Sequence, residues 1–402
     1  MAGRLGGRLA ARATLAVRLV RRRQVARLLL ALVAVILVAG AAVALATAIR
    51  TDLLPAALTA LRLRLSPAAR EASSVARFEE LAARHALRPG TVLVTVVTAG
   101  MRDYVLNWLY DLDRHNVTEY IVVAVDPTIY EELCSRGVPT LLFPLEWQFV
   151  DGHTVFPLPT EKHVHEFLQG AYGRVVGAKL FAIYHMVKAG YDVVFSDVDI
   201  VFPRPGFFDH LLALAESHPD AGVFVSQEPA FVCYQFKWFP EGYLPCVNTG
   251  LYMIRSRPSM VALLHEAVTA TAGWTTHLAN QPTFNQLLYE RGMLGKVDNA
   301  TGEVAWAPAL VAIDNNIAMN GHHYFHGHDF PGRLPPPHEP LAVHANFLTG
   351  DSKRESLRKR GLWHDASAHF VRRNGRFAPT SCDHRTAPDG GGNACVRRCA
   401  LL

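Results

Sequence analysis

Acidic residues are almost absent from the start of the chain. The first 52 residues contain nine arginines and one aspartate, which gives them a charge of +8. The formal net charge of all 402 residues is +5, so the remainder of the chain carries −3. A slightly acidic main part lacks the broad positive surface to which phosphate backbones bind, and we therefore expect no nucleic-acid partner. Half of the residues are hydrophobic and 19% are charged, which excludes a disordered chain.

Charged residues are also missing from Leu28 to Ile49, an apolar run of 22 residues. A helix of this length spans about 33 Å, enough to cross a bilayer core of about 30 Å. The arginines precede the run, so the positive-inside rule leaves the N-terminus in the cytosol and takes everything after residue 50 across the membrane. The pattern predicts a single-pass type II signal-anchor.

Two alternatives remain for this N-terminal segment. Ala44-Leu45-Ala46 resembles the cleavage site of a signal peptide, but the apolar run exceeds the usual core of roughly 7–15 residues. An organelle transit peptide is also rich in arginine and poor in acidic residues. Serine is absent from the segment, however, and a long apolar run is not typical of transit peptides.

No cysteine precedes residue 134, and all six lie beyond the apolar run. An even number in an oxidising compartment permits up to three disulfides, and Cys233–Cys246 is a candidate local pair. Two glycosylation sequons, Asn116-Val117-Thr118 and Asn299-Ala300-Thr301, also agree with a lumenal location. The cysteines are Cys134, Cys233, Cys246, Cys382, Cys395 and Cys399.

From Thr91 onward, short apolar runs alternate with amphipathic segments of about a dozen residues. This alternation predicts an α/β fold with a mainly parallel twisted sheet flanked by helices. Such sheets bind ligands beyond the C-terminal ends of their strands. The predicted strands are Thr91–Thr98, Tyr120–Val125, Thr140–Phe143 and Tyr191–Ser196, and the predicted helices are Asp103–Arg114 and Arg174–Gly190.

Composition divides the chain into five parts. The α/β domain is the largest of them, and a stem rich in Ala, Leu and Arg precedes it. The parts are a cytosolic basic tail (1–27), a transmembrane signal-anchor (28–49), a helical stem (50–89), the α/β domain (90–380) and a tail that contains cysteine (381–402).

The strongest motif is Asp197-Val198-Asp199, which directly follows a predicted buried strand. Two carboxylates so placed are costly unless a cation compensates them, and oxygen ligands suit Mg²⁺ or Mn²⁺ held together with substrate phosphates. A solvated turn is the simplest alternative. A phosphatase of the haloacid dehalogenase type also uses Asp-x-Asp after a strand, but it needs a small hydroxyl residue soon afterwards, where Ile200-Val201-Phe202 stands.

Four blocks in order resemble glycosyltransferase family 77, which includes plant and algal xylosyl- and arabinosyltransferases. The first block, Lys179–Phe208, contains the Asp-Val-Asp motif and is similar to the family's nucleotide-diphospho-sugar transferase domain. The resemblance covers roughly residues 90–365 and implies a GT-A-like catalytic domain. The other blocks are Asn248–Ser256, Asn280-Gln281 with Phe284-Asn285, and His344-Ala345-Asn346 with Gly350, Lys353 and Gly361-Leu362-Trp363.

The resemblance implies a metal site at the Asp-Val-Asp motif. His344 ends an apolar run, and related retaining transferases place a histidine there that completes the coordination of the ion. We therefore expect Asp197, Asp199 and His344 to hold Mn²⁺ or Mg²⁺, with both carboxylates also acting in catalysis. A capping or core histidine is the alternative for His344.

Lys353 and Gly350 are expected in a polar loop before a helix at Ser356–Arg360. Close backbone approach and an ammonium charge are what a nucleotide diphosphate leaving group needs. A solvated basic cluster is the alternative for Lys353.

Several polar residues are expected to bind the donor. Asn248, Thr249 and Gly250 offer amide and hydroxyl groups beside a glycine that permits close approach, although a strand-entry turn would also explain them. Gln281 and Asn285 share one helical face at i, i+4. The family usually has Asp where this chain has Asn280, an amide that still forms hydrogen bonds but carries no charge. Thr98, Lys179 and Asp197 complete the expected donor site.

The resemblance and the predicted signal-anchor together imply a metal-dependent retaining glycosyltransferase of the Golgi membrane with a lumenal catalytic domain. The expected partners are a UDP-sugar donor (a pentose such as xylose or arabinose, or galactose), a glycan or glycoprotein acceptor, and the membrane through the N-terminal helix. No carboxylate nucleophile is evident, which favours a same-face mechanism. The alternatives are a galactosyl- or mannosyltransferase of another family with this fold, and a non-catalytic, lectin-like descendant.

Overall fold

The computed structural model describes residues 67–143, 149–150, 153–154, 171–229, 232, 246–272, 280–297, 304–326, 339–373 and 376–377. The chain divides into two compact units, Met1–Arg70 and Glu71–Leu402, and the sheets described here belong to the second. The predicted membrane span lies outside the described residues. Within the described part of the chain, no helix is both long and apolar enough to cross a bilayer.

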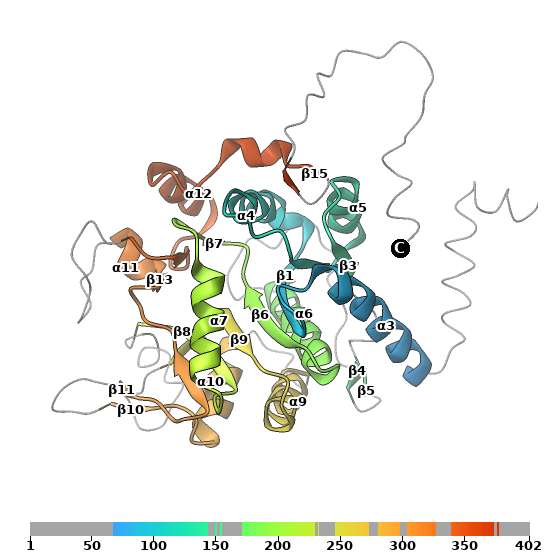
Figure 1. Ribbon diagram of the computed structural model, residues 1–402, viewed down its shortest axis with the longest axis vertical. Coiled ribbons are helices and arrows are strands. Elements are labelled where there is room, and N and C mark those ends of the chain that lie inside the picture. Colours follow the sequence, from blue (N-terminus) through green and yellow to red (C-terminus); the bar gives the residue numbers. More distant parts are fainter. Residues whose placement is uncertain are drawn as a thin grey trace, which may run out of the picture. The chain divides into compact units, whose positions relative to one another are not determined.

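A seven-stranded mixed sheet forms the centre of this unit, with the strand order β12-β8-β9-β6-β1-β2-β3 (Figure 1). All neighbouring strands pair in parallel except β9, which is antiparallel to both β6 and β8. The predicted α/β class is confirmed, with one reversed strand inside the sheet. The strands are β1 (Thr91–Val97), β2 (Ile121–Ala124), β3 (Thr140–Leu142), β6 (Asp192–Ser196), β8 (Val223–Gln227), β9 (Val247–Ile254) and β12 (Leu310–Ala312).

Successive side chains of a strand point to opposite faces of the sheet, so these apolar strands present apolar side chains on both faces. Helices cover both faces. Val92 and Val94 of β1 belong to one hydrophobic core, and Leu93 and Val97 belong to the other. The first core includes side chains of α3 (Pro67–His85), α6 (Ala171–Lys188), α9 (Pro258–Ala272) and α10 (Asn280–Glu290). The second includes side chains of α4 (Arg102–Arg114), α5 (Pro127–Ser135) and α7 (Phe207–Ser217).

Helix α3 falls in the segment predicted as a stem. Phe78 and Leu81 of this helix are buried in the first core. The C-terminal end of the predicted stem is therefore packed as part of the α/β unit.

The reversed strand β9 explains how distant motifs meet. Leu251 of β9 lies opposite Ser196, and Val247 lies opposite Gln227. The start of β9 therefore lies at the same edge of the sheet as the ends of β6 and β8. The register between β8 and β9 shifts after Val225, an irregularity of the kind that re-aims side chains beside functional sites.

A small three-stranded sheet brings the C-terminal block to this edge. It has the order β13-β14-β7, formed by β13 (Ala318–Asn320), β14 (Ala342–His344) and β7 (Ile200–Val201). His344 pairs with Ile200 in antiparallel register, and the backbone N–H of Ala345 donates to the carbonyl of Asp199 at 3.0 Å.

The helix that carries Lys353 is longer than predicted. It is α12, Gly350–Lys359, so Gly350 and Lys353 lie on the helix and the prediction of a polar loop is wrong. The first turn, Gly-Asp-Ser-Lys, has no apolar residue, and hydrophobic periodicity therefore cannot reveal it. The helix ends before Gly361, whose φ of +69° favours glycine.

The remaining elements are short. Cys246 is disulfide-bonded, and its predicted partner Cys233 lies outside the described residues. The elements are η1 (Ala99–Met101), β4 (Phe149–Val150), β5 (His153–Thr154), β10 (Lys296–Val297), β11 (Val304–Ala305), α11 (Gly321–His326), η3 (Asp365–His369), β15 (Arg372–Arg373) and β16 (Arg376–Phe377).

Candidate active site

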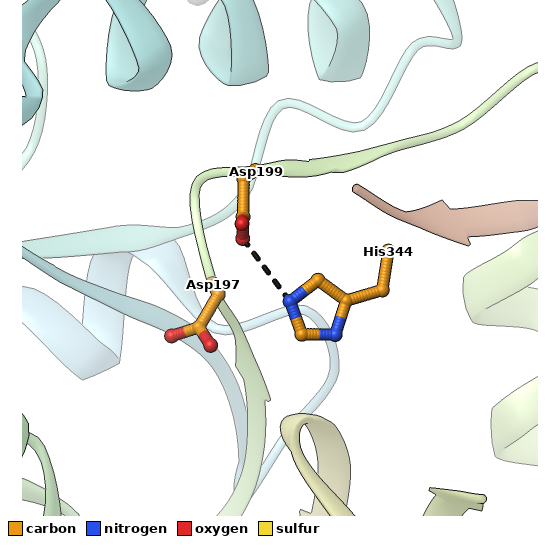
Figure 2. A group of neighbouring side chains, drawn as sticks. All are labelled: Asp197, Asp199 and His344. Atoms are coloured by element: carbon orange, nitrogen blue, oxygen red, sulfur yellow. Dashed lines mark ion pairs between the residues drawn. The ribbon is translucent and has the colours of Figure 1, made fainter. Parts of the chain in front are cut away.

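Three side chains with metal-ligand chemistry meet at the edge of the sheet. Asp197 and Asp199 flank Val198 in the turn between β6 and β7, and His344 is the last residue of β14. One possible ligand atom from each residue lies within 4.8 Å of the others. Figure 2 shows Asp199 and His344 facing one another, with 3.3 Å between Oδ1 and Nε2. The structure thus brings the three predicted ligands together from separate parts of the chain.

A lysine accompanies each of the two carboxylates. Lys179 Nζ lies 3.0 and 3.2 Å from the two oxygens of Asp197, and Lys353 Nζ lies 2.5 Å from Asp199 Oδ2. A carboxylate has about four lone-pair positions, so an oxygen that accepts a hydrogen bond from lysine keeps a lone pair that can bind a cation. The oxygen and imidazole donors fit Mn²⁺ or Mg²⁺ by their chemistry.

The two carboxylates differ in their electrostatics. Burial raises the pKa of Asp197, although Lys179 opposes this shift. Burial would also raise the pKa of Asp199, but Lys353 and His344 outweigh it and hold that pKa well below its ordinary value. Asp199 is therefore firmly ionised, and its attraction in turn raises the pKa of Lys353 against the effect of burial. The ion pair of Asp199 and Lys353 lies directly beside the imidazole of His344.

Lys179 is a buried cation held between helix and sheet. It extends from α6, and its Nζ lies 4.3 Å from the ring centroid of Phe195. Burial lowers its pKa, and the attraction of Asp197 opposes that shift. Lys179 is therefore paired with Asp197, and a direct contact between Lys179 and the donor stays a prediction.

Asn248 connects the start of β9 to the histidine. Its Oδ1 lies 3.0 Å from His344 Nδ1 and accepts a hydrogen bond of 2.7 Å from the backbone N–H of Gly250. A β-carbon at Gly250 would overlap the imidazole of His344. We predicted a close approach at this glycine, and the structure shows that the group approaching it is the imidazole.

Gln281 and Thr249 extend the hydrogen-bond network that contains Asn248. Gln281 Oε1 accepts from the backbone N–H of Thr249 at 3.0 Å, and its Nε2 donates to Glu228 Oε1 at 2.9 Å. Asn248 Nδ2 donates to the same oxygen of Glu228. Glu228 was not among the predicted site residues, and it follows β8 at the edge where the other strands end. An apolar run, Val223–Val225, that leads into a lone carboxylate was the available signal.

Two predicted donor ligands do not join this cluster. Asn285 has no exposed surface, and its amide both accepts from the backbone N–H of Val247 and donates to the carbonyl of that residue at 2.9 Å. It therefore fastens α10 to β9. Thr98 precedes η1, and its buried hydroxyl has no hydrogen-bond partner among the described residues. Direct donor contacts by either residue stay predictions, and the side chain of Asn280 is not described.

The Gly361-Leu362-Trp363 part of the C-terminal block positions Lys353 rather than lining the site. Trp363 packs edge-to-face on Tyr104 of α4 at 5.3 Å between ring centroids. Asn107, also in α4, donates to the carbonyl of Leu362 at 3.2 Å and accepts from the backbone N–H of His364 at 2.8 Å. These contacts fix the turn after α12 on α4 and so orient the helix that directs Lys353 at Asp199.

Gly350 lies at the exposed start of α12. Its carbonyl accepts a hydrogen bond of 3.3 Å from the hydroxyl of Tyr104. Its φ of +53° lies in the left-handed region, and a β-carbon there would meet no atom within 4 Å. Space is therefore open on the β-carbon side of Gly350, and its approach to a diphosphate stays a prediction.

Comparison with known proteins agrees with the predicted family. Residues 115–357 match the family described as nucleotide-diphospho-sugar transferase. The chain is 25% identical over 285 residues to β-arabinofuranosyltransferase RAY1 of Arabidopsis thaliana, which is 69% of this chain and 48% of that protein. The chain thus spans about half the length of that relative.

Two solved glycosyltransferases are also similar. Mouse xyloside xylosyltransferase 1 matches 65% of this chain and 99% of its own, with 13% identity and a TM-score of 0.37. Galactosyltransferase LgtC in complex with donor and acceptor sugar analogues matches 67% of this chain and 94% of its own, with 13% identity and a TM-score of 0.41. Because the family match covers more than half of the chain, the protein belongs to the nucleotide-diphospho-sugar transferase family.

Proposed function

We propose that this protein is a metal-dependent glycosyltransferase that moves a sugar from a UDP-sugar to a hydroxyl of a glycan or glycoprotein. The single observation that carries the proposal is the meeting of Asp197, Asp199 and His344 at the edge where the strands end. Parallel sheets bind ligands at this edge. Mn²⁺ or Mg²⁺ bound there would supply Lewis-acid stabilisation of the charge that develops on the departing diphosphate.

The side chains of the site have separate tasks in this proposal. Asp199 and His344 would hold the ion, and Asp197 would hold it with lone pairs that do not accept from Lys179. Lys353 adds a second positive charge near the diphosphate, since it lies at the same carboxylate and on the same helix as the open backbone of Gly350. Asn248, Thr249 and Gln281 supply polar groups for the hydroxyls of the donor sugar.

We further propose that the sugar is transferred with retention by a same-face mechanism. Glu228 is the carboxylate that the structure adds to the site, but its Oε1 already accepts from two side-chain amides. A carboxylate engaged in this way is a weaker nucleophile than an unbound one. The departing phosphate is then the group that takes the proton of the acceptor.

The donor, acceptor and location belong to the same proposal. The similarity to an arabinofuranosyltransferase supports a pentose donor, with galactose as the next candidate. The arginine-rich start and the apolar run at 28–49 support a type II anchor in the Golgi membrane, with the catalytic domain in the lumen.

Binding of UDP tests this proposal directly. We expect the full-length protein to bind UDP when Mn²⁺ is present. In Asp199→Ala, we expect that Mn²⁺ no longer promotes the binding of UDP. If UDP fails to bind with Mn²⁺ present, or binds Asp199→Ala equally well, the metal-dependent mechanism is wrong. A panel of UDP-sugars tested for donor hydrolysis then identifies the sugar. Binding of glycans without hydrolysis of any donor would favour the lectin-like alternative.

A further inference from the structure

Glu228 receives hydrogen bonds from amide side chains of three different segments. Asn248 Nδ2 and Gln281 Nε2 both donate to its Oε1, the second at 2.9 Å. Asn346, two residues after His344, approaches its Oε2 through Nδ2 at 3.5 Å. One carboxylate therefore joins the end of β8 to β9, α10 and the loop after β14.

This carboxylate fixes which way the amide of Asn248 points. An ionised carboxylate only accepts hydrogen bonds, so the NH₂ end of the amide must face Glu228. The oxygen end then faces the backbone N–H of Gly250 at 2.7 Å and Nδ1 of His344 at 3.0 Å. If the amide turned over, it would place NH₂ against N–H at Gly250 and leave Glu228 facing an oxygen.

The orientation of Asn248 in turn decides the tautomer of His344. An amide oxygen accepts only, so Nδ1 of the imidazole must carry a hydrogen. The lone pair of a neutral imidazole is then on Nε2, the nitrogen that lies 3.3 Å from Asp199 Oδ1. A hydrogen bond on the second ring nitrogen is the usual way in which a protein selects the nitrogen that binds a metal.

The same carboxylate also orients Gln281. Because Nε2 of Gln281 faces Glu228, its Oε1 faces the backbone N–H of Thr249 at 3.0 Å. The amides of Asn248 in β9 and Gln281 in α10 thus both take their direction from one oxygen of Glu228.

We propose that Glu228 is a positioning residue which, through Asn248, holds His344 in the form that presents Nε2 to the metal. The inference rests on the proposed function, since it concerns the same ion. It assigns to Glu228 a role that depends on accepting hydrogen bonds rather than on negative charge.

Mn²⁺ affinity of the full-length protein with UDP present tests this role without any measurement of activity. Free Mn²⁺ is followed by its electron paramagnetic resonance signal in wild type, Glu228→Met and Glu228→Gln. Methionine keeps the length of the side chain but accepts no comparable hydrogen bond. We expect Glu228→Met to bind Mn²⁺ about 10–100-fold more weakly, the usual effect of losing an outer partner of a metal ligand. Glutamine keeps one oxygen that can accept from both amides, and its affinity should stay within about threefold of wild type.

Each outcome has one meaning. Glu216→Met is the matched control, because Glu216 forms a surface ion pair with Arg88 and its side chain is 70% exposed. Thermal unfolding of every variant separates a loss of fold from a loss of affinity. Unchanged affinity in Glu228→Met overturns the positioning role, and equal weakening in Glu228→Gln overturns it in favour of charge. Failure of wild type to bind Mn²⁺ instead refutes the metal site of the proposed function.

Discussion

The imidazole of His344 lies against the backbone of Gly250, with no room between them for a side chain. A β-carbon at position 250 would overlap Cε1 of the ring and lie 2.8 Å from Nδ1. The backbone at this position does not have a positive φ. Glycine is therefore required by the approach of the histidine and not by backbone conformation.

Gly250→Ala should displace His344 and weaken the site while leaving the fold intact. We expect the Mn²⁺-dependent affinity for UDP to fall at least about tenfold, since one ligand loses its position. Titration calorimetry with UDP at fixed Mn²⁺ measures this change. Gly206→Ala serves as the control, because Gly206 has a φ of +98° and open space around it. That substitution strains the backbone without touching the site, so equal losses of affinity in both variants would contradict the explanation.

The sheet and the acidic motif could be predicted from the sequence for a local reason. The segments that form β1, β2, β3 and β6 are short and mainly apolar, and such segments indicate buried strands without any knowledge of the partner strand. Asp197 and Asp199 follow one of them directly, so their place at the ligand-binding edge followed from the strand itself. The resemblance to a known family then added His344 and Lys353.

The remaining parts of the site depend on contacts that no local pattern records. His344 and Asn248 are 96 positions apart, and they meet because β9 runs against its neighbours. That reversal was not predicted, and without it neither the role of Gly250 nor the partners of Glu228 can be seen. The first turn of α12 was missed because its contacts, such as the ion pair of Lys353 with Asp199, are polar.

Removal of the charge of Lys353 should slow the transfer more than it weakens binding. Lys353→Met loses the ammonium group that lies at the expected position of the leaving diphosphate, and we expect kcat to fall by about 10²-fold. Steady-state kinetics at saturating Mn²⁺ measure the separate effects on kcat and KM. Lys359→Met is the matched control on the same helix, since Lys359 is 71% exposed and pairs with Glu355. An unchanged kcat in Lys353→Met would exclude this role.

Asn107 should matter for stability although it lies outside the candidate site. Asn107→Leu would leave the backbone N–H of His364 and the carbonyl of Leu362 without their buried partner. We expect the free energy of unfolding to fall by about 2–3 kcal/mol, which chemical denaturation measures. Gln286→Leu removes an exposed amide that bonds to Glu290 and should change stability by less than about 0.5 kcal/mol. Similar small effects from both substitutions would show that Asn107 does not anchor the turn.

Mn²⁺ should stabilise the wild-type protein against unfolding, because an ion that binds only the folded state shifts the equilibrium toward it. A concentration of 100 times the dissociation constant stabilises by about 2.7 kcal/mol. Asp199→Asn should abolish this shift, since the amide removes the charge of the carboxylate that faces both Lys353 and His344. Asp209→Asn, which changes an exposed carboxylate in the first turn of α7, should keep the full shift. Thermal unfolding with and without Mn²⁺, followed by addition of EDTA, measures each case. A shift that survives in Asp199→Asn would place the ion at different residues.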